Sequence, residues 1–536
     1  ELLGDLYHQC GLRDRVERSK YFTSALEKYQ KAGEYHKADP LLPFVPATLL
    51  SKEGDVRMDL GQYPEAQDLY QQVLASARLA SGTVEATIKL GRSLLRQGKF
   101  SESAKVLERQ LEGSVLTEQQ ESRACYLLGD AYYESKRYDM MMEAYGRALR
   151  LEEYVAADED IDPMRAHMRM TNFLYLAQGK YKEAVAQYEE ILKKYPQGRY
   201  RFRTIYYLGQ AYSAMNNLNE AARYFTMLIG ENPELRYVDP AFLKDAYFKL
   251  GRIHFQKKDY PKAIKAYEAL MERYPDDPLV PSILERQGDC YAQLALYAKA
   301  EEVYLQVLDN FPESSNWSLT ALKAGQLKEN LSEFAAASEF YARIKRRDPS
   351  DPLCTESEYR RLEMELRMAQ TEPGVAAERR FASVLRDAVQ AQSEYPDEIR
   401  FYAQQGVAAY SLKDFSTAAD AFVKYLDQSG DLERIPRCTF LLGDALLQLE
   451  RHQEAADILQ KRIEMEGDDD ERAHALFLLA VCQKKLNEFD KAIVTLNELL
   501  TSHPSSSFIP EASAEKSRLE WSSRNVGYLQ GTSQAP

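Results

Sequence analysis

The feature that most constrains this chain is a pair of small residues, twelve positions apart, that recurs along it. A large apolar residue stands four positions after the second member of each pair. We call the first member the anchor residue. The anchors are Gly54, Gly91, Gly129, Asn172, Gly209, Gly251, Gly288, Gly325, Gly406, Gly443 and Ala480. A spacing that recurs in this way predicts one supersecondary element used many times over.

The residue types at these positions predict two helices that cross closely. The anchor is mostly glycine, and glycine inside a helix costs about 1 kcal/mol relative to alanine, so it needs a packing reason. The second member is mostly alanine, as in Ala263, and the large residue one turn later, as in Tyr267, lies on the same helical face. We expect that residue to fill the space between adjacent helix hairpins. Prolines such as Pro275 then end the second helix.

Stretches such as LGRIHFQKKDYPKAIKAYEALMERYP and LGDAYYESKRYDMMMEAYGRAL resemble the tetratricopeptide repeat (TPR) family over nearly the whole chain. The resemblance implies an all-α, right-handed superhelical solenoid of about 12–13 helix-turn-helix repeats plus a C-terminal capping helix. Most anchors stand 37 residues apart, against about 34 in the family. The extra residues follow the proline, as in PDDPLVPS. This longer unit is similar to TPR proteins of the bacterial envelope, such as the outer-membrane assembly lipoprotein and the cell-division coordinator protein.

The array is predicted to be uneven. Residues 1–350 form an N-terminal TPR array with an irregular first unit, and residues 351–397 a degenerate repeat or seam. Residues 398–522 form a C-terminal array with a closing helix, and residues 523–536 a disordered tail. Longer connections are expected at 151–163 and 231–240.

Composition and motifs argue against several functions. The net charge of -14 disfavours general nucleic-acid binding, and no apolar run is long enough for direct membrane insertion. The six cysteines form no CxxC and the seven histidines are scattered, so we expect no metal site and no cofactor. Asp158, Asp160 and Asp162 give DxDxD, but Pro163 stands where an EF-hand needs glycine, which favours an acidic loop. No catalytic motif is present, so we expect no enzymatic activity.

The family resemblance implies that partners bind on the concave face, which the first helix of each pair lines. Residues six and three before the anchor, and one and four after it, share that face. In the first half of the chain they are Arg123, Tyr126, Asp130, Tyr133, Arg203, Tyr206, Gln210, Asp245, Phe248, Arg252 and Phe255. Further along they are Arg400, Tyr410, Arg437, Phe440, Asp444, His474 and Phe477. Tyrosine, phenylalanine and arginine concentrate binding energy in polypeptide interfaces, although packing against a neighbouring helix also explains the aromatic residues.

The sequence therefore favours a non-catalytic scaffold that binds protein or peptide partners. The repeat style suggests a bacterial envelope or secretion complex in the periplasm or cell envelope, whereas the sparse cysteines point towards the cytoplasm. Two alternatives stay open. The chain begins at Glu1, so it could be the regulatory or substrate-recruiting region of a larger enzyme. It could also be a self-assembling homo-oligomeric scaffold.

Overall fold

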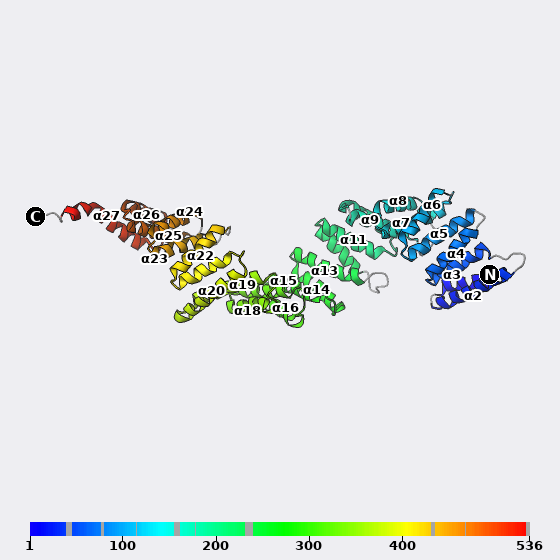
Figure 1. Cartoon of the computed structure of the whole chain (residues 1–536), viewed down its shortest axis with the longest axis horizontal. Coiled ribbons are helices and arrows are strands. Elements are labelled where there is room, and N and C mark those ends of the chain that lie inside the picture. The colour runs from blue at the N-terminus through cyan, green and yellow to red at the C-terminus, as the bar shows by residue number, and fades with distance from the viewer. Residues whose placement is uncertain are drawn as a thin grey trace. The chain divides into compact units, whose positions relative to one another are not determined.

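The structure is a computed structural model, and it describes residues 1–14, 16–38, 45–76, 80–113, 115–154, 161–176, 178–230, 240–429, 435–466 and 468–531. In this part of the chain the fold is entirely helical, with one short 3-10 helix, η1 (Glu152–Tyr154). By contact density the chain divides into two compact units, Glu1–Pro275 and Asp276–Pro536. Figure 1 shows the helices in chain order.

The first unit holds fourteen α-helices in its described residues. They are α1 (Leu2–Arg13), α2 (Arg18–Ala38), α3 (Ala47–Asp59), α4 (Tyr63–Ser76), α5 (Ala80–Arg96), α6 (Phe100–Gly113), α7 (Glu118–Glu134), α8 (Tyr138–Arg150), α9 (Pro163–Leu176), α10 (Tyr181–Lys194), α11 (Arg201–Ala214), α12 (Leu218–Gly230), α13 (Pro240–Gln256) and α14 (Tyr260–Arg273).

The second unit holds thirteen. They are α15 (Val280–Gln293), α16 (Tyr297–Asn310), α17 (Trp317–Asn330), α18 (Phe334–Arg347), α19 (Cys354–Thr371), α20 (Gly374–Glu394), α21 (Arg400–Ser411), α22 (Phe415–Gln428), α23 (Ile435–Gln448), α24 (His452–Glu464), α25 (Asp469–Lys485), α26 (Phe489–Ser502) and α27 (Ile509–Gly531). Within each unit consecutive helices pack on one another. The predicted all-α solenoid of paired helices, with a helix after the last pair, is confirmed.

The large residue of each helix pair makes a contact that we did not predict. It lies against the anchor of its own pair and also packs towards the next pair, as Tyr70 does in one cluster with Leu90 and Leu94 of α5. A Cβ atom added to Gly54 would stand 2.7 Å from the ring of Tyr70, and one added to Gly406 would stand 2.5 Å from the ring of Phe422. The anchor is therefore glycine because a buried ring occupies the volume of its side chain.

The turn inside each pair has one repeated geometry. The residue seven positions after every anchor has a positive φ: Gly61, Gly98, Lys136, Gly179, Asn216, Lys258, Ala295, Ser332, Lys413, Glu450 and Asn487. In the turn after α13, the amide of Lys258 donates to the carbonyl of Phe255, and the amide of Asp259 donates to that of His254, both at 2.8 Å. This pair of hydrogen bonds is a Schellman motif, which satisfies the last carbonyls of the first helix.

The lengthened links between pairs consist of two successive turns. After α16, the amide of Ser314 donates to the carbonyl of Phe311, and the amide of Trp317 donates to that of Ser314. After α18, Asp351 and Cys354 repeat the arrangement. The residues added after the proline therefore form a hydrogen-bonded turn that leads directly into the next helix.

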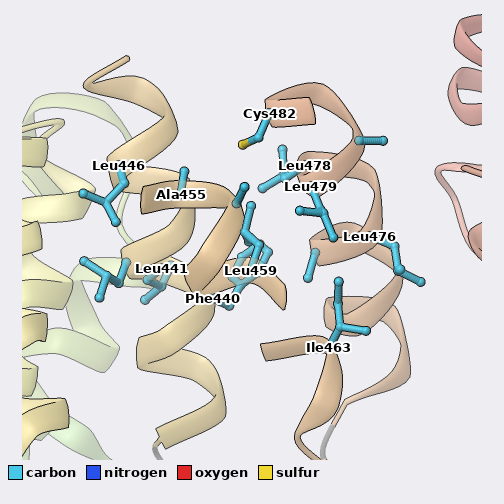
Figure 2. Close-up of a cluster of buried hydrophobic side chains, with 14 of the residues drawn as sticks. Phe440, Leu441, Leu446, Ala455, Leu459, Ile463, Leu476, Leu478, Leu479 and Cys482 are labelled. Carbon is cyan, nitrogen blue, oxygen red and sulfur yellow. The ribbon is translucent and has the colours of Figure 1, made fainter. Parts of the chain in front are cut away.

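The hydrophobic core is a series of local clusters, each drawn from neighbouring pairs. Figure 2 shows part of the cluster built by α21 to α27, in which Leu441 and Phe440 of α23, Leu459 of α24 and Leu479 of α25 are buried together. Each helix pair buries its apolar faces only against its neighbours, as in other repeat proteins.

The pair α19–α20 occupies the predicted degenerate repeat. Its helices are joined through Glu372 and Pro373, and its left-handed residue is Gly374, the first residue of α20, at a φ of 55°. Its helices pack on α18 and on α21. The predicted boundaries at 350 and 397 both lie within the second compact unit and stay predictions.

Three other predicted segments are only partly described. Helix α27 continues past residue 522, where we expected a disordered tail to begin, and residues 532–536 lie outside the described residues. Asp158, Asp160 and most of the 231–240 connection also lie outside them. Asp162 is described, and its side chain accepts a hydrogen bond from the amide of Arg165 at the start of α9. In the described part of the chain, no helix combines the length and apolarity that crossing a bilayer requires.

Candidate protein-interaction face

The first helices of successive pairs pack side by side. In the first unit α5 contacts α7, α7 contacts α9, α9 contacts α11 and α11 contacts α13, and in the second unit α19, α21, α23 and α25 do the same. We call the surface that these helices present the first-helix face. All the predicted site residues lie on first helices.

A cleft of about 200 Å³ opens on this face between α5, α7 and α9. Its lining consists of Arg92, Leu95, Arg96, Phe100, Leu127, Asp130, Glu134, Arg165 and Arg169. Four guanidinium groups and two carboxylates thus surround a small apolar floor. The charged lining carries a formal excess of two positive charges, in a chain whose net charge is -14.

The buried carboxylate of Asp130 organises one wall of the cleft. It accepts hydrogen bonds from Arg165 at 2.5 Å, from Arg169 at 2.7 Å and from the hydroxyl of Tyr145. Burial, together with the charge of Asp130, raises the pKa of Tyr145 well above its usual value, so this hydroxyl remains a donor. Arg169 also binds Glu134 at 2.8 Å. The two arginines are therefore held in place before any partner arrives.

The contact between tyrosine, carboxylate and base recurs in other pairs. Asp55 accepts from Tyr70 at 2.9 Å and from Lys89 at 2.7 Å. Asp289 does the same with Tyr304 at 2.8 Å and Lys323 at 2.7 Å. In each case the tyrosine comes from the second helix and the base from the next first helix. The acidic residue one position after the anchor thus joins two adjacent helix pairs through its hydrogen bonds.

Four predicted site residues are buried side chains: Tyr126, Asp130, Tyr206 and Phe440. Phe440 belongs to the core of the second unit, and the hydroxyl of Tyr206 donates to Asp245 at 2.5 Å. Each of these four residues is at most 6% exposed in this structure. The three aromatic residues among them stand three positions before their anchors, where the first helix meets its neighbours.

The other predicted residues of the first unit are at least partly exposed. Arg123 pairs with Glu85 at 2.8 Å, and the guanidinium of Arg203 lies 5.1 Å from the ring of Phe242. Gln210 donates to the hydroxyl of Tyr206 and so joins Asp245 in one group. The ring of Tyr133 lies 4.0 Å from the guanidinium of Arg169. The remaining predicted residues of the first unit are Phe248, Arg252 and Phe255 of α13.

In the second unit the predicted residues gather towards the C-terminal pairs. Arg437 is exposed and binds Glu471 at 2.7 Å, while Asp444 accepts from the hydroxyl of Tyr410. His474 lies between the rings of Phe440 and Phe508, at 5.0 and 4.2 Å. Phe477 stacks on the same Phe508 at 5.7 Å and is half-buried.

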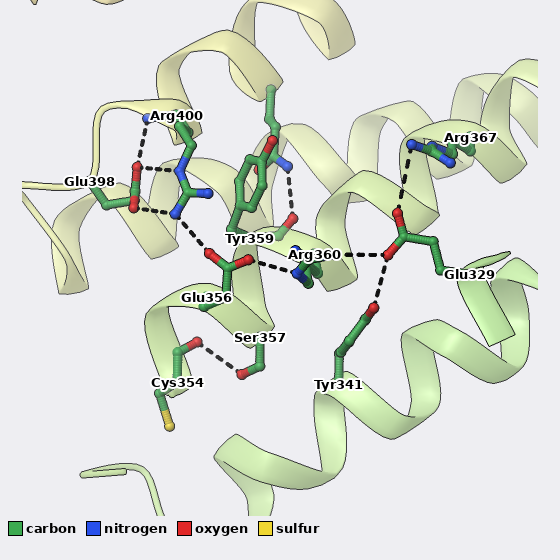
Figure 3. A network of polar contacts seen from close by, with 11 residues as sticks. Glu329, Tyr341, Cys354, Glu356, Ser357, Tyr359, Arg360, Arg367, Glu398 and Arg400 are labelled. Carbon is green, nitrogen blue, oxygen red and sulfur yellow. Dashed lines mark hydrogen bonds and ion pairs between the residues drawn. The ribbon is translucent and has the colours of Figure 1, made fainter. Parts of the chain in front are cut away.

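On α17, α19 and α21, the first-helix face of the second unit is occupied by ion pairs within the chain (Figure 3). Glu356 of α19 binds Arg360 at 2.6 Å and Arg400 of α21 at 2.9 Å. Arg400 also binds Glu398 at 2.6 Å, and Arg360 reaches Glu329 of α17 at 3.2 Å. The charges on this stretch are therefore satisfied by one another, which ties three consecutive pairs together.

The arginines of the cleft are not among the residues predicted from the sequence. At the anchors Gly91 and Asn172, the offsets that define the concave face fall on Arg92 and Arg169. Arg165 and Arg169 also stand four positions apart, which places them on one face of α9. Both arginines bind Asp130 because of the way α9 packs against α7. The repeat pattern does not show this packing.

The paired helices, most of which have a glycine under the large residue, define a repeat protein of the α-solenoid class. Three family models described as tetratricopeptide repeat match the chain. One matches residues 245–313, the second 51–112, 88–156, 206–278 and 404–465, and the third 169–198 and 474–506. Together they cover more than half of the chain, which therefore belongs to the tetratricopeptide repeat family.

Curated relatives are similar over parts of their length. Tetratricopeptide repeat protein 21B of Xenopus laevis is 22% identical over 282 residues, which cover 49% of this chain and 20% of that protein. Heat shock protein STI1 of Saccharomyces cerevisiae is 22% identical over 172 residues, which cover 28% of this chain and 27% of that protein. The matches thus span a fifth to about a quarter of these relatives.

Solved structures are similar at low identity. The C-terminal part of a TPR repeat-containing protein from Cytophaga hutchinsonii is 14% identical, with a TM-score of 0.40, and the match covers 50% of this chain and 98% of that one. Naa15/Naa10 bound to HypK-THB is 16% identical, with a TM-score of 0.35 and coverage of 88% and 65%. The APC/C hetero-tetramer Cut9-Hcn1 is 13% identical, with a TM-score of 0.32 and coverage of 96% and 95%.

Proposed function

We propose that this protein is a non-catalytic scaffold that binds polypeptide partners along the first-helix face, and that the arginine-lined cleft between α5, α7 and α9 takes an acidic segment of the partner. The observation that carries the proposal is the cleft itself, where arginines meet an apolar floor. Arginine binds carboxylates in a planar, bidentate geometry and is enriched at the energetic centres of protein interfaces.

The charge distribution supports an acidic segment. Because the chain carries a net charge of -14, an acidic partner is repelled by most of the surface and attracted where positive charge is concentrated. Two of the four arginines are oriented by Asp130, so binding costs less side-chain entropy there. The exposed Arg252 and the half-exposed Phe248 and Phe255 extend the same face along α13.

A pair of matched charge reversals tests the site. Arg96 of α5 and Lys105 of α6 are both exposed, but only Arg96 lines the cleft. In a crosslinked, quantified pull-down from native cells, we expect Arg96→Glu to lower recovery of the direct partners about tenfold, a change of about 1.4 kcal/mol. Lys105→Glu should recover them as the unaltered chain does. Equal recovery by the two variants would show that the cleft is not the binding site.

We also propose that the scaffold assembles a complex of the bacterial envelope or of a secretion system. The support is the 37-residue spacing of the repeat, which is similar to that of envelope TPR proteins. Fractionation of the source cells tests this assignment. We expect the protein in the periplasmic or membrane-associated fraction, and its recovery with the cytoplasmic enzymes would overturn the assignment.

A further inference from the structure

A groove of about 560 Å³ lies between the second helices α22 and α24 of the second unit, over α23. We call it the second-helix groove. Leu442 and Leu446 of α23 form its floor, and both are buried. Val423 of α22 and Ile458 of α24 form apolar walls, and Val423 is 44% exposed. The groove is thus an apolar surface that is open to solvent, and α22 and α24 take no part in the first-helix face.

In other pairs a tyrosine occupies the equivalent space between second helices. Tyr212 of α11 stands three positions after its anchor, and its ring stacks on that of Tyr224 of α12 at 5.6 Å. Its hydroxyl donates to Glu189 of α10 at 2.7 Å, so these side chains join two second helices. Tyr132 of α7 stands at the same position and donates to Glu108 of α6. The position three residues after the anchor therefore decides whether this space is filled.

At the second-helix groove all three of these positions carry aliphatic residues. The equivalents of Tyr212, Tyr224 and Glu189 are Leu446, Ile458 and Val423. Two aromatic rings and a carboxylate are thus exchanged for shorter side chains, and the volume that they would fill is left open. A matched change at three positions that meet one another replaces a polar contact by an accessible apolar surface, and such a surface marks an interaction site.

Four charged side chains stand on the rim of the groove in two matched pairs. Asp420 of α22 and Asp457 of α24 lie at equivalent positions, and Lys424 and Lys461 follow them by one helical turn. All four are exposed, and within the described part of the chain none of them forms an ion pair, whereas the other two charges of the rim bind each other. Because α22 and α24 are both second helices, they run in the same direction. The groove therefore has an acidic level and, about 6 Å further along, a basic level.

We propose that the second-helix groove binds an amphipathic helix of a partner protein, which lies parallel to α22 and α24 with basic side chains at the two aspartates and acidic side chains one turn later, at the two lysines. A helix pairs its own amides and carbonyls, whereas an extended segment would leave them unpaired over an apolar floor, because the surrounding helices use their backbone groups internally. The direction follows from the helix macrodipole, whose positive end then meets the aspartates and whose negative end meets the lysines.

Two labelled peptides of equal composition test the proposal by fluorescence anisotropy with the full chain. Both have about 14 residues, or about four helical turns, with leucines along one stripe. The first carries lysines beside the stripe and glutamates one turn later, and the second has lysines and glutamates exchanged. We expect the first to bind with a Kd of about 10–100 µM and the second at least about fivefold more weakly. The second is the better helix in isolation, because its acids precede its bases, so helicity cannot explain this order.

Variants of the chain locate the binding. The double variant Val423→Glu with Leu446→Tyr carries the residue types that other pairs have at these positions, so it should fold while the groove is filled. We expect it to raise the Kd of the first peptide at least about tenfold. Val494→Glu, at an exposed apolar residue of α26 outside the groove, is the matched control and should bind as the unaltered chain does. Lys461→Glu should weaken the first peptide and strengthen the second, because it reverses a charge at the basic level.

Four outcomes would overturn the proposal. They are binding of neither peptide, equal binding of the two, binding that the double variant does not weaken, and equal binding of a peptide with a central proline, which would mean an extended segment. Sedimentation equilibrium without peptide tests the remaining occupant, a second copy of the chain. We expect the mass to stay at 61.4 kDa, and a rise with concentration that the double variant abolishes would assign the groove to that copy instead. None of these outcomes depends on the arginine cleft, which is tested by Arg96→Glu.

Discussion

At the scale of single residues, the repeat depends on one contact, in which a large buried side chain lies over a glycine of its own pair. The ring of Phe422 is fully buried and occupies the space where a side chain on Gly406 would stand. Eight further anchors in the described chain are glycines with a large residue in the same place. Glycine is needed there for its volume, since these positions have ordinary helical backbone angles.

Gly406→Ala is therefore expected to destabilise the protein by about 1–3 kcal/mol, even though alanine is the better helix former. Gly146 of α8 is the matched control, because a Cβ atom there meets nothing within 4 Å. Gly146→Ala should leave the protein as stable as before or more stable by about 0.5–1 kcal/mol. Urea unfolding followed by circular dichroism measures both changes. A Gly406→Ala protein at least as stable as the unaltered chain would refute this account of the anchors.

At the scale of elements, helix pairs are joined by packing and by ion pairs that cross from one pair to the next. Among the ion pairs of the described residues, the most buried one links α24 and α25. Arg462 has a side chain that is only 1% exposed, and it binds Glu471 at 2.9 Å as well as the carbonyls of Met465 and Asp468. Arg437 binds the same Glu471, but its side chain is 61% exposed.

This shared carboxylate permits a controlled comparison. Arg462→Met leaves buried acceptors without their donor and should cost about 3 kcal/mol of unfolding free energy. Arg437→Met removes a solvent-screened partner of Glu471 and should cost less than about 1 kcal/mol. Both values come from the same unfolding measurement. Equal losses would mean that burial does not decide the strength of this link.

At the scale of the whole molecule, stability is approximately the sum of the contacts within and between neighbouring helix pairs. Titratable groups that lie in different pairs should therefore make separate contributions to the unfolding free energy. His167, His254 and His474 lie on first helices of three different pairs, and burial lowers the pKa of each. Around His474, the charges of Asp444 and Glu471 raise its pKa and that of Arg437 lowers it, but burial is the largest effect.

A histidine whose pKa is lowered on folding stabilises the protein fully only above its unfolded pKa, near 6.5. The unfolding free energy should therefore fall as the pH is lowered from about 7.5 to about 5.5, by at most about 1.4 kcal/mol per pH unit for each proton taken up. His474→Phe, which keeps an aromatic ring between Phe440 and Phe508, should make the fall shallower. Thermal unfolding at several pH values measures the slope. An unchanged slope in this variant would exclude His474 as a contributor.

Much of the fold could be predicted from the sequence, because the contacts that define a helix pair join residues at constant separations. Gly54 and Tyr70, like Gly406 and Phe422, stand sixteen positions apart, so repetition makes the contact visible in one dimension. The left-handed turn residue was not predicted. Glycine marks it at Gly98, whereas Glu450 adopts the same conformation because the flanking helices hold it there.

The candidate site was less predictable. The offset from the anchor places a residue on the first-helix face but does not show whether the next pair covers it. Asp130 is closed by arginines 35 and 39 positions later, and Tyr206 by Asp245, 39 positions later. The sequence by itself thus determined the helix pairs and their register, because those depend on local spacing. Only the tertiary structure decided which side chains remain free to meet a partner, because that depends on what each neighbouring pair places against them.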